Sequence, residues 1–459
     1  MKKFIYSAFA VALLSMAPAC NFLDYDLNVD PNNPSDAGMP QLLPTAEVAY
    51  AYHLGGDMGR YISIWTQYHM GADRQHLAYD AYRMTESDVN NLWNGLYGNV
   101  LSNLKFITEK AAEGRSPHYG GVAKVLIALN VAQMVDMWDD IPYSQALQYD
   151  KNIQPAFDKG SDLYPQMIAL LDEAIKDLQE PSSVLSPKSD DFVYAGNLTK
   201  WTKLARSAKA RLQLRFTKAN SSSYATVLST LDAGALADNS DNAGIVFGDG
   251  ATSANPWFQF GDQRTGDVVM GGYLVNLLKS LNDPRLPVFA ALKNGDYTGA
   301  TAGVPAEGVA ASGFGTFFGS VNSPVYYLTY PEVKFIEAEC AFQTGNKLRA
   351  ATAFNDGVKA SLDMFGTPST TYTDANASET ETSITLEKIM TQKYLALYTS
   401  PEAYNDWRRT GLPNWPLSVG QTQMPRRWPL AQDERVYNNA NAQPYLNKTV
   451  FDRVFWDVQ

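Results

Sequence analysis

The chain has 459 residues, 45% of them hydrophobic, which is enough apolar material for a large buried core. Its formal net charge is −11 and its pI is about 4.9, so it lacks the basic balance of a phosphate-binding surface, and a nucleic-acid-binding protein is excluded. After the first segment, no run of residues approaches the eighteen consecutive apolar positions of a membrane-spanning helix.

The first twenty residues have the organisation of an export signal. A basic start is followed by a mostly apolar run over residues 4–16 and by small residues that end at Ala19. The run is too short to cross a bilayer, which needs about 20 residues. We therefore expect residues 1–19 to be a signal peptide that is removed from the mature protein.

Cys20 follows these small residues at once, and this arrangement resembles the lipobox of bacterial lipoproteins. In such proteins the cysteine is lipidated on its sulfur and becomes the new N-terminus. The pattern departs from the usual one at Ala17, where lipoboxes usually carry Leu, and an ordinary signal cut near Ala19 would instead leave a free thiol. With Cys20 lipidated, Cys340 is the only other cysteine and no disulfide is available, so the fold depends on packing.

The segment over residues 20–40 begins with a stretch rich in Asp and Asn, which favour neither helix nor strand. We interpret it as an acidic tether between the lipid and a folded body. That body is expected to be a single domain over residues 41–459.

Apolar residues recur with helical spacing through the first half of the folded body. The spacing predicts four helices, at about residues 87–113, 119–138, 162–178 and directly after Asn197. Gly114 is expected to end the first of them. Residues 244–331 lack this spacing and are rich in Gly, Ser, Asn and aromatic residues, so we expect long irregular loops with short helices there.

Helical spacing returns in three further segments, at about residues 332–343, 347–364 and 384–398. Small residues, among them Ala338 and Ala350, stand where the first two of these helices would touch, and Gly345 makes the turn between them. This helix pair resembles the second part of a tetratricopeptide repeat. We therefore expect an all-α fold, a tetratricopeptide-like α-α superhelix with long irregular loop insertions that supply the binding surface. The alternative is a generic antiparallel helical domain. The last sixty residues are expected to be loop.

Several short segments resemble, in order and spacing, the motifs of the SusD/RagB family of outer-membrane nutrient-binding lipoproteins. They are FLD at residues 22–24, NVDPNNP at 28–34, DMWDDIPYSQA at 136–146, WTKLA at 201–205, KARL at 209–212, EAYNDWRR at 402–409 and PRRWPL at 425–430. The segment at 136–146 is the most telling one, although Asp139 stands where the family usually has Gly. Within it, Asp136, Asp139 and Asp140 are expected to cap and turn a helix end.

The resemblance implies a helical, SusD-like fold with tetratricopeptide-like helix pairs over the whole mature chain. It also implies a lipid anchor in the outer membrane with the body facing the cell exterior. The implied partner is a SusC-like TonB-dependent outer-membrane transporter, a β-barrel that the family member covers like a lid. Acidic tethers in this family resemble a signal for transfer to the outer face, and a plain flexible linker is the alternative.

Catalytic and metal-binding motifs are absent from the sequence. The four histidines, His53, His69, His76 and His118, form no H-E-x-x-H pattern, and there is no zinc-spaced Cys pair. A nucleophile elbow and a phosphate-cradling loop are also missing. Residues 238–249 resemble a calcium loop only faintly, because the sixth position is not Gly. We expect no metal, no cofactor and no enzymatic activity.

Two regions combine aromatic residues with polar ones, as a ligand site for a sugar or a peptide requires. The first runs from Tyr61 to Arg83, and the second surrounds residues 257–264 and continues to 314–318. In the resembling family, ligands lie on an aromatic platform made from an early loop and mid-chain insertions. The candidate ligand residues are Trp65, Gln67, Tyr68, Arg74, Tyr79, Tyr82, Trp257, Phe260, Arg264 and Phe317.

Two classes of function remain open from the sequence. One is a non-enzymatic surface subunit that captures oligosaccharide or oligopeptide and delivers it to the transporter. The other is a surface-anchored hydrolase on a helical scaffold, because two catalytic carboxylates need only be close in space. The missing motifs favour capture, and the choice between glycan and peptide stays open.

Overall fold

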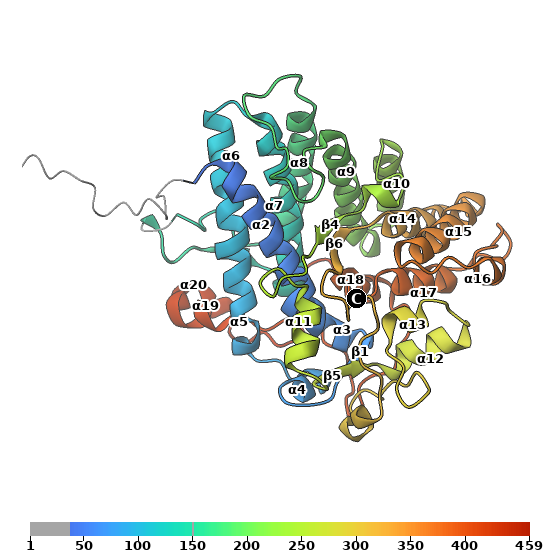
Figure 1. Ribbon diagram of the computed structural model, residues 1–459. Helices are drawn as coiled ribbons and strands as arrows, with labels where there is room; N and C mark the ends of the chain where they lie inside the picture. Colours follow the sequence, from blue (N-terminus) through green and yellow to red (C-terminus); the bar gives the residue numbers. More distant parts are fainter. Residues whose placement is uncertain (1–36, 149–150) are drawn as a thin grey trace, which may run out of the picture.

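The structure, a computed structural model, describes residues 37–148 and 151–459. The export signal, Cys20 and the acidic tether up to residue 36 lie outside the described residues, and the expectations placed on them stay predictions. Within the described part the chain is mostly helical. Long helices occupy the upper half of the view in Figure 1, and short elements and loops lie below them.

The helices predicted for the first half are confirmed. The one over 87–113 consists of three successive segments, α5 (Glu86–Gly95), the π-helical η2 (Leu96–Leu101) and α6 (Ser102–Glu113), and Gly114 follows it. The other three are α7 (Pro117–Trp138), α8 (Gly160–Gln179) and α9 (Leu198–Leu214). Asn197 begins α9 because its side chain accepts the backbone N–H of Lys200, which would otherwise have no partner.

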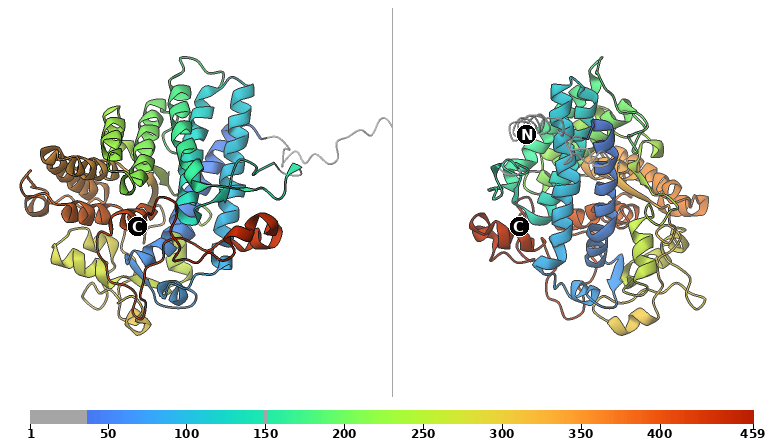
Figure 2. Two further views of the ribbon diagram at one scale, coloured as in Figure 1. Left: turned by 180° about the vertical axis from the view of Figure 1, so that it is seen from behind. Right: turned by 60° about the vertical axis from the view of Figure 1, so that its left-hand side comes forward.

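Three helices precede or interrupt this series without having been predicted. They are α2 (Met39–His53) with its π-helical continuation η1 (Leu54–Met58), α3 (Gly59–Trp65) and α10 (Ser223–Asp232). Consecutive helices α6, α7, α8, α9 and α10 pack side by side, and α10 packs on the pair α14 (Tyr330–Gln343) and α15 (Lys347–Met364) (Figure 2). This stacking of helix pairs confirms the tetratricopeptide-like superhelix.

The turn between α14 and α15 has the geometry that the sequence predicts. Gly345 has a φ of +84°, a conformation that glycine adopts without steric cost. The backbone N–H of Asn346 donates to Ala341 at 2.9 Å, which satisfies a carbonyl at the end of α14. Ala338 and Ala350 are both fully buried, so small side chains do lie where the helices approach each other.

The stretch over 244–331 is irregular, as predicted, but it also contains strands. One antiparallel ribbon joins the two ends of the stretch, where β4 (Ala243–Val246) pairs with β6 (Pro324–Leu328). A second ties the stretch to the early part of the chain, where β5 (Val268–Met270) pairs with β1 (His69–Gly71). A third ribbon joins β2 (Ile141–Pro142) to β3 (Phe157–Asp158). The short helices of the stretch over 244–331 are α11 (Pro256–Gln263), α12 (Gly272–Ser280), α13 (Leu286–Phe289) and η6 (Pro305–Val309).

The prediction that the last sixty residues are loop is wrong for one buried helix, α18 (Pro401–Thr410). It follows α16 (Thr370–Asn376) and α17 (Leu386–Ala396), the latter lying within the helix predicted over 384–398. The buried positions of α18 include charged residues, so the usual apolar stripe is missing from its sequence. The remaining C-terminal residues are loop except for α19 (Gln432–Tyr437), α20 (Asn439–Ala442) and the short turn η7 (Gln443–Tyr445).

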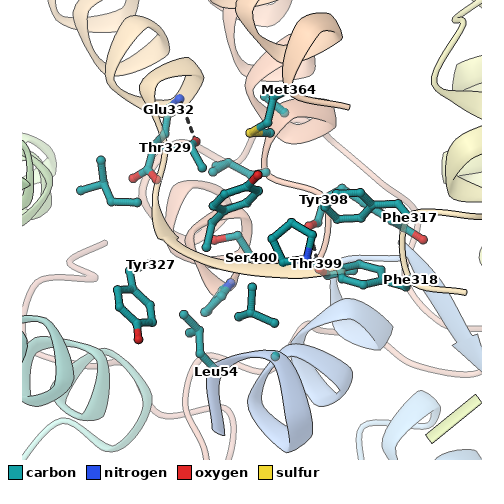
Figure 3. A pocket seen from close by; sticks show the side chains of 18 of the residues that line it. Leu54, Phe317, Phe318, Tyr327, Thr329, Glu332, Met364, Tyr398, Thr399 and Ser400 are labelled. Atoms are coloured by element: carbon teal, nitrogen blue, oxygen red, sulfur yellow. Dashed lines mark hydrogen bonds between the residues drawn. The ribbon is translucent and has the colours of Figure 1, made fainter. Parts of the chain in front are cut away.

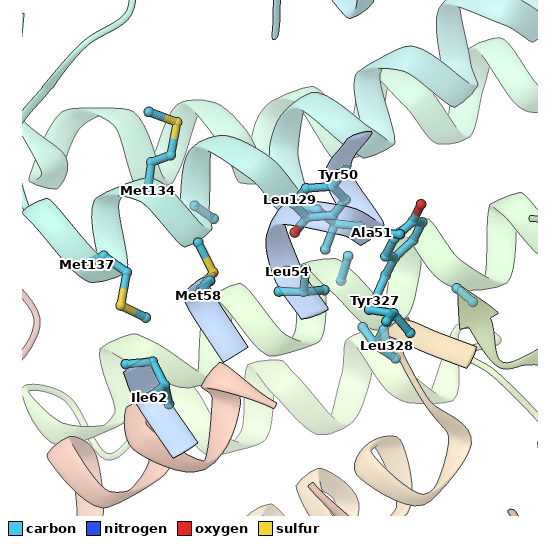
Figure 4. Close-up of a cluster of buried hydrophobic side chains, with 14 of the residues drawn as sticks. Tyr50, Ala51, Leu54, Met58, Ile62, Leu129, Met134, Met137, Tyr327 and Leu328 are labelled. Atoms are coloured by element: carbon cyan, nitrogen blue, oxygen red, sulfur yellow. The ribbon is translucent and has the colours of Figure 1, made fainter. Parts of the chain in front are cut away.

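The main hydrophobic core lies between α7 and the run of α2, η1 and α3 (Figure 4). Tyr50, Leu54, Met58 and Ile62 form one face of this run and are all buried. α7 is long and apolar enough to span a membrane, but 94% of that window is buried inside the protein. It is therefore the central helix of a folded body.

Buried ion pairs connect this core to α18. Arg215 binds both Asp136 at the end of α7 and Glu402 of α18, and all three side chains are nearly inaccessible. The expectation that Asp136 caps a helix end is thus wrong, because its carboxylate pairs with a cation in the core. Asp139 and Asp140 do turn the chain: Asp139 has a φ of +72° directly after α7, and Asp140 accepts the backbone N–H at the start of α8.

Candidate functional site

Five candidate ligand residues of the early region are buried and bind other parts of the protein. The Trp65 indole donates to the Tyr79 carbonyl at 3.1 Å, and the Tyr68 hydroxyl donates to the Tyr394 carbonyl at 2.5 Å. Gln67 donates to the Pro416 carbonyl, and the Tyr82 hydroxyl accepts from a backbone N–H of the same C-terminal loop. Gln67, Tyr68 and Tyr82 thus fasten the early segment to the C-terminal segment. Trp65 and Tyr79 hold the early segment together, since the Tyr79 hydroxyl donates to Asp88.

Two candidates of the second region are also largely enclosed. Trp257 is fully buried, and its ring stacks on Phe318 with ring centres 5.1 Å apart. Phe317 is half-buried and packs against Phe318 and Phe365. Of the ten candidates, Phe260 and Arg264 line an open cleft, and exposed Arg74 lies close to it.

That cleft lies where η1, α3, α4 (His76–Asp80) and α11 meet, and it has a cavity volume of about 210 Å³. It brings together residues from both regions singled out in the sequence, together with the end of α2. Its lining consists of Tyr52, Asp57, Arg60, Tyr61, Gln75, His76, Pro256, Gln259, Phe260, Gln263 and Arg264.

Glycines position the two walls of the cleft. The helical course of the chain breaks at Gly56, whose ψ of −118° is not helical, and this break separates Asp57 and Arg60 from α2. A Cβ atom on Gly55 would lie 2.5 Å from the Val325 side chain and 3.3 Å from Pro256 at the start of α11. Only glycine therefore lets β6 approach η1 this closely, and a larger residue would also crowd the start of α11.

Polar contacts fix the shape of the site. Arg60 is ion-paired with Asp57, and its guanidinium lies 4.5 Å from the centre of the Phe260 ring, in cation–π geometry. Asn255 begins α11 by accepting the backbone N–H of Trp257 at 2.7 Å. One wall of the cleft thus presents an aromatic face with a guanidinium held over it.

His76 forms part of the cleft floor and is uncharged at neutral pH. Burial, reinforced by Arg60, lowers its pKa to about 4. Its Nδ1 lies 3.6 Å from the carboxylate of Asp267, which is itself paired with Arg74 at 2.7 Å. The charge of the cleft lining at neutral pH therefore comes from Arg60, Arg264 and Asp57.

A second cavity lies at the centre of the molecule, between η1, β6 and the start of α18 (Figure 3). Phe317, Phe318, Tyr398 and Met364 line it, and Glu332 closes one side, ion-paired with Arg211. Its volume of about 60 Å³ has room for roughly two water molecules, at about 30 Å³ each, and not for a sugar ring. It is a packing feature of the core.

A larger groove of about 510 Å³ lies between α12 and the C-terminal loop. Its walls are mainly apolar, from Tyr273, Leu277, Pro416, Leu417 and Val419. Gln67, Asn276, Ser280 and Thr301 add polar groups to this lining, so one candidate residue of the early region, Gln67, lies at this groove, and no charged side chain of the described residues does.

Several cleft residues had no signal in the sequence that singled them out. Tyr52, Asp57 and Arg60 stand in or beside helices, where a polar residue is most often merely solvated. The Gly-Gly-Asp sequence at residues 55–57, which breaks a helix, is the one feature that could have drawn attention to them.

The described residues 37–148 and 151–459 contain no group of three or more His, Cys, Asp or Glu that could hold a metal ion. In the segment that faintly resembles a calcium loop, Asp238 accepts the backbone N–H of Ser240, and Asp241 is ion-paired with Lys203. The carboxylates of that loop thus hold the local backbone and a neighbouring helix.

Known proteins resemble the chain over most of its length. A family model described as SusD-like, starch-binding and associating with the outer membrane matches residues 31–430. A SusD/RagB family protein from Bacteroides thetaiotaomicron has 25% identity and a TM-score of 0.76, covering 92% of this chain and 99% of its own. A chitin-binding SusD homologue from Flavobacterium johnsoniae has 23% identity and a TM-score of 0.75, covering 92% and 97%. The comparison with curated proteins finds no match.

Proposed function

The chain belongs to the SusD-like family, and we propose that it is a cell-surface lipoprotein that captures an oligosaccharide in the cleft at α11 and delivers it to a SusC-like TonB-dependent transporter. The family description supports carbohydrate binding and association with the outer membrane. The observation that carries the proposal is the cleft itself, where the aromatic ring of Phe260 lies among amides and guanidinium groups.

The chemistry of this lining suits a sugar. One face of a sugar ring is apolar and stacks on an aromatic ring, while its hydroxyls need donors and acceptors around the edge. Phe260 and Tyr52 supply rings, and Gln75, Gln259 and Gln263 supply amides. A peptide with apolar side chains would find few apolar pockets here. Two structural neighbours are described as chitin-binding, which agrees with a glycan ligand.

The cleft is unsuited to hydrolysis of a glycosidic bond. Glycosidases use two carboxyl groups about 5 to 9.5 Å apart, one as acid and the other as nucleophile or base. Asp57 is the single carboxylate of the lining, and it is already ion-paired with Arg60. We therefore propose capture without cleavage.

The location and the partner are part of the same proposal. Lipidation of Cys20 would hold the body at the outer membrane, facing the cell exterior, next to the barrel that takes up the ligand. The acidic segment between Cys20 and α2 would be the tether between lipid and body.

The experiment is a calorimetric titration of the protein with starch- and chitin-derived oligosaccharides, followed by product analysis of the same mixtures. We expect saturable binding of at least one of them and recovery of the oligosaccharide intact. Products that accumulate in proportion to protein concentration would contradict capture and support the surface-anchored hydrolase instead.

A further inference from the structure

The capture cleft carries more positive than negative side-chain charge, although the chain as a whole has a formal net charge of −11. Arg60 and Arg264 line the cleft, and Asp57 is the one carboxylate in its lining. His76 in its floor is neutral at physiological pH because burial lowers its pKa to about 4. Two guanidinium groups thus face one carboxylate.

The two arginines differ in the contacts that their side chains already make within the protein. Arg60 is held by its ion pair with Asp57 and by the Phe260 ring beneath it. Arg264 lies at the C-terminal end of α11 and is exposed. Within the described part of the chain, its side chain makes neither a hydrogen bond nor an ion pair. Its five N–H donors are therefore available to a ligand.

The surroundings of His76 show the same excess of positive charge. After burial, which is the largest cause, Arg60, Arg264 and the nearby Arg74 each lower the pKa of His76, and Asp57 opposes them. Asp267, the other carboxylate beside His76, is buried and paired with Arg74. The exposed carboxylates Asp73 and Asp262 are close in sequence, but neither lines the cleft.

We infer that the oligosaccharide captured in this cleft carries an anionic group, a carboxylate or a sulfate on a sugar ring, and that Arg264 binds that group. This inference rests on the proposed function. A guanidinium matches the oxygens of either anion with two parallel N–H bonds. A sugar ring that lies against the exposed part of Phe260 would be close to Arg264, because the two residues are one helical turn apart at the C-terminal end of α11 and both line the cleft.

The test compares oligosaccharides that share backbone and length and differ only in charge. Gluco-, chito- and galacto-oligosaccharides are each titrated in neutral form, with a ring oxidised to a uronate, and with a sulfate ester. We expect at least one charged form to bind about three- to tenfold more tightly than its neutral counterpart at low salt, with the advantage shrinking as salt is added. The stronger of the two charged forms identifies the anion.

Arg264→Gln should abolish this advantage, so that the charged and neutral forms of the same oligosaccharide bind the variant with equal affinity. Arg83→Gln, which removes an exposed arginine outside the lining, is the matched control and should keep it. Equal affinities for charged and neutral forms, or an advantage that survives Arg264→Gln, would overturn the inference and leave glycan capture standing. Binding of none of these oligosaccharides would overturn both.

Discussion

Burial decides what each aromatic side chain of this protein can do. Trp65 and Trp257 have no exposed surface, whereas Phe260 is partly exposed in the cleft. A buried ring contributes to the stability of the fold, because it fills space in a closely packed core. An exposed ring beside polar groups contributes to ligand binding instead.

Trp257→Ala should therefore destabilise the fold, by about 3–5 kcal/mol, because it leaves a large cavity beneath α11. Trp257→Phe, which keeps an aromatic ring against Phe318, should cost clearly less. Chemical denaturation followed by circular dichroism measures both. A Trp257→Ala protein that unfolds at the wild-type midpoint would place the indole outside the core.

Asp80 gives the protein a pH-dependent stability. Burial raises its pKa from 3.8 to about 7, although the N–H groups of Gly303 and Gly71 oppose the shift. The folded state thus holds a proton that the unfolded state releases, and on account of this group the free energy of unfolding falls as the pH rises from about 4 to about 7. Below that window the contribution of Asp80 is fully present.

Asp80→Asn should flatten the decrease in melting temperature between pH 4 and pH 7, because the amide does not ionise and can still accept from Gly303. Asp73→Asn, which changes an exposed aspartate, serves as the control and should leave the pH profile as it is. An identical slope in Asp80→Asn and wild type would show that Asp80 is ionised throughout this range.

At the level of elements, the pair α14 and α15 depends on small side chains. Ala338 is fully buried in a cluster that includes Phe335, Ala351 and Phe354. A longer side chain at position 338 has no unfilled space to enter, so it must displace its neighbours.

Ala338→Leu should destabilise the protein by about 1–3 kcal/mol. Thr352→Leu adds a leucine to an exposed position of α15 and should change the free energy of unfolding by less than about 0.5 kcal/mol. Equilibrium unfolding in urea compares the two. Equal midpoints for Ala338→Leu and wild type would mean that the helices are farther apart than the structure has them.

Two physical features explain why the sequence missed α18 and the strands. Helices α5 to α9, α14 and α15 have apolar residues at helical spacing or a clear turn signal, and they were predicted. The α18 helix was missed because it buries charges, among them Glu402, Asp406 and Arg409, in ion pairs. The strands have five residues or fewer, too short for an alternating pattern to stand out.

The candidate site was predictable only as two regions. Phe260 and Arg264 were singled out and do line the cleft, but Trp65, Tyr68 and Trp257 are buried. Composition cannot distinguish a ring that packs in the core from one that faces a ligand, since both have similar aromatic and polar neighbours in the sequence. That difference is set by long-range packing, such as the approach of α11 to Gly55.

At the scale of the whole molecule, the proposed lipid anchor at Cys20 is a claim that can be tested apart from the fold. Cys20→Ala should release the protein from the membrane fraction and leave its melting temperature unchanged, because the described body begins well after this position. Fractionation of cells labelled with radioactive palmitate tests this. Wild-type protein that takes up no label would contradict the lipid anchor.

The central claim is that the cleft at α11 captures an oligosaccharide. The most direct measurement is calorimetric titration of Phe260→Ala beside Phe192→Ala, which truncates an exposed phenylalanine outside the cleft lining. Loss of the stacking ring should cost more than about 1 kcal/mol of binding free energy, roughly a fivefold loss of affinity, in Phe260→Ala alone. Both variants should fold as the wild type does. Equal affinities of Phe260→Ala and wild type for an oligosaccharide that the protein binds would contradict the claim.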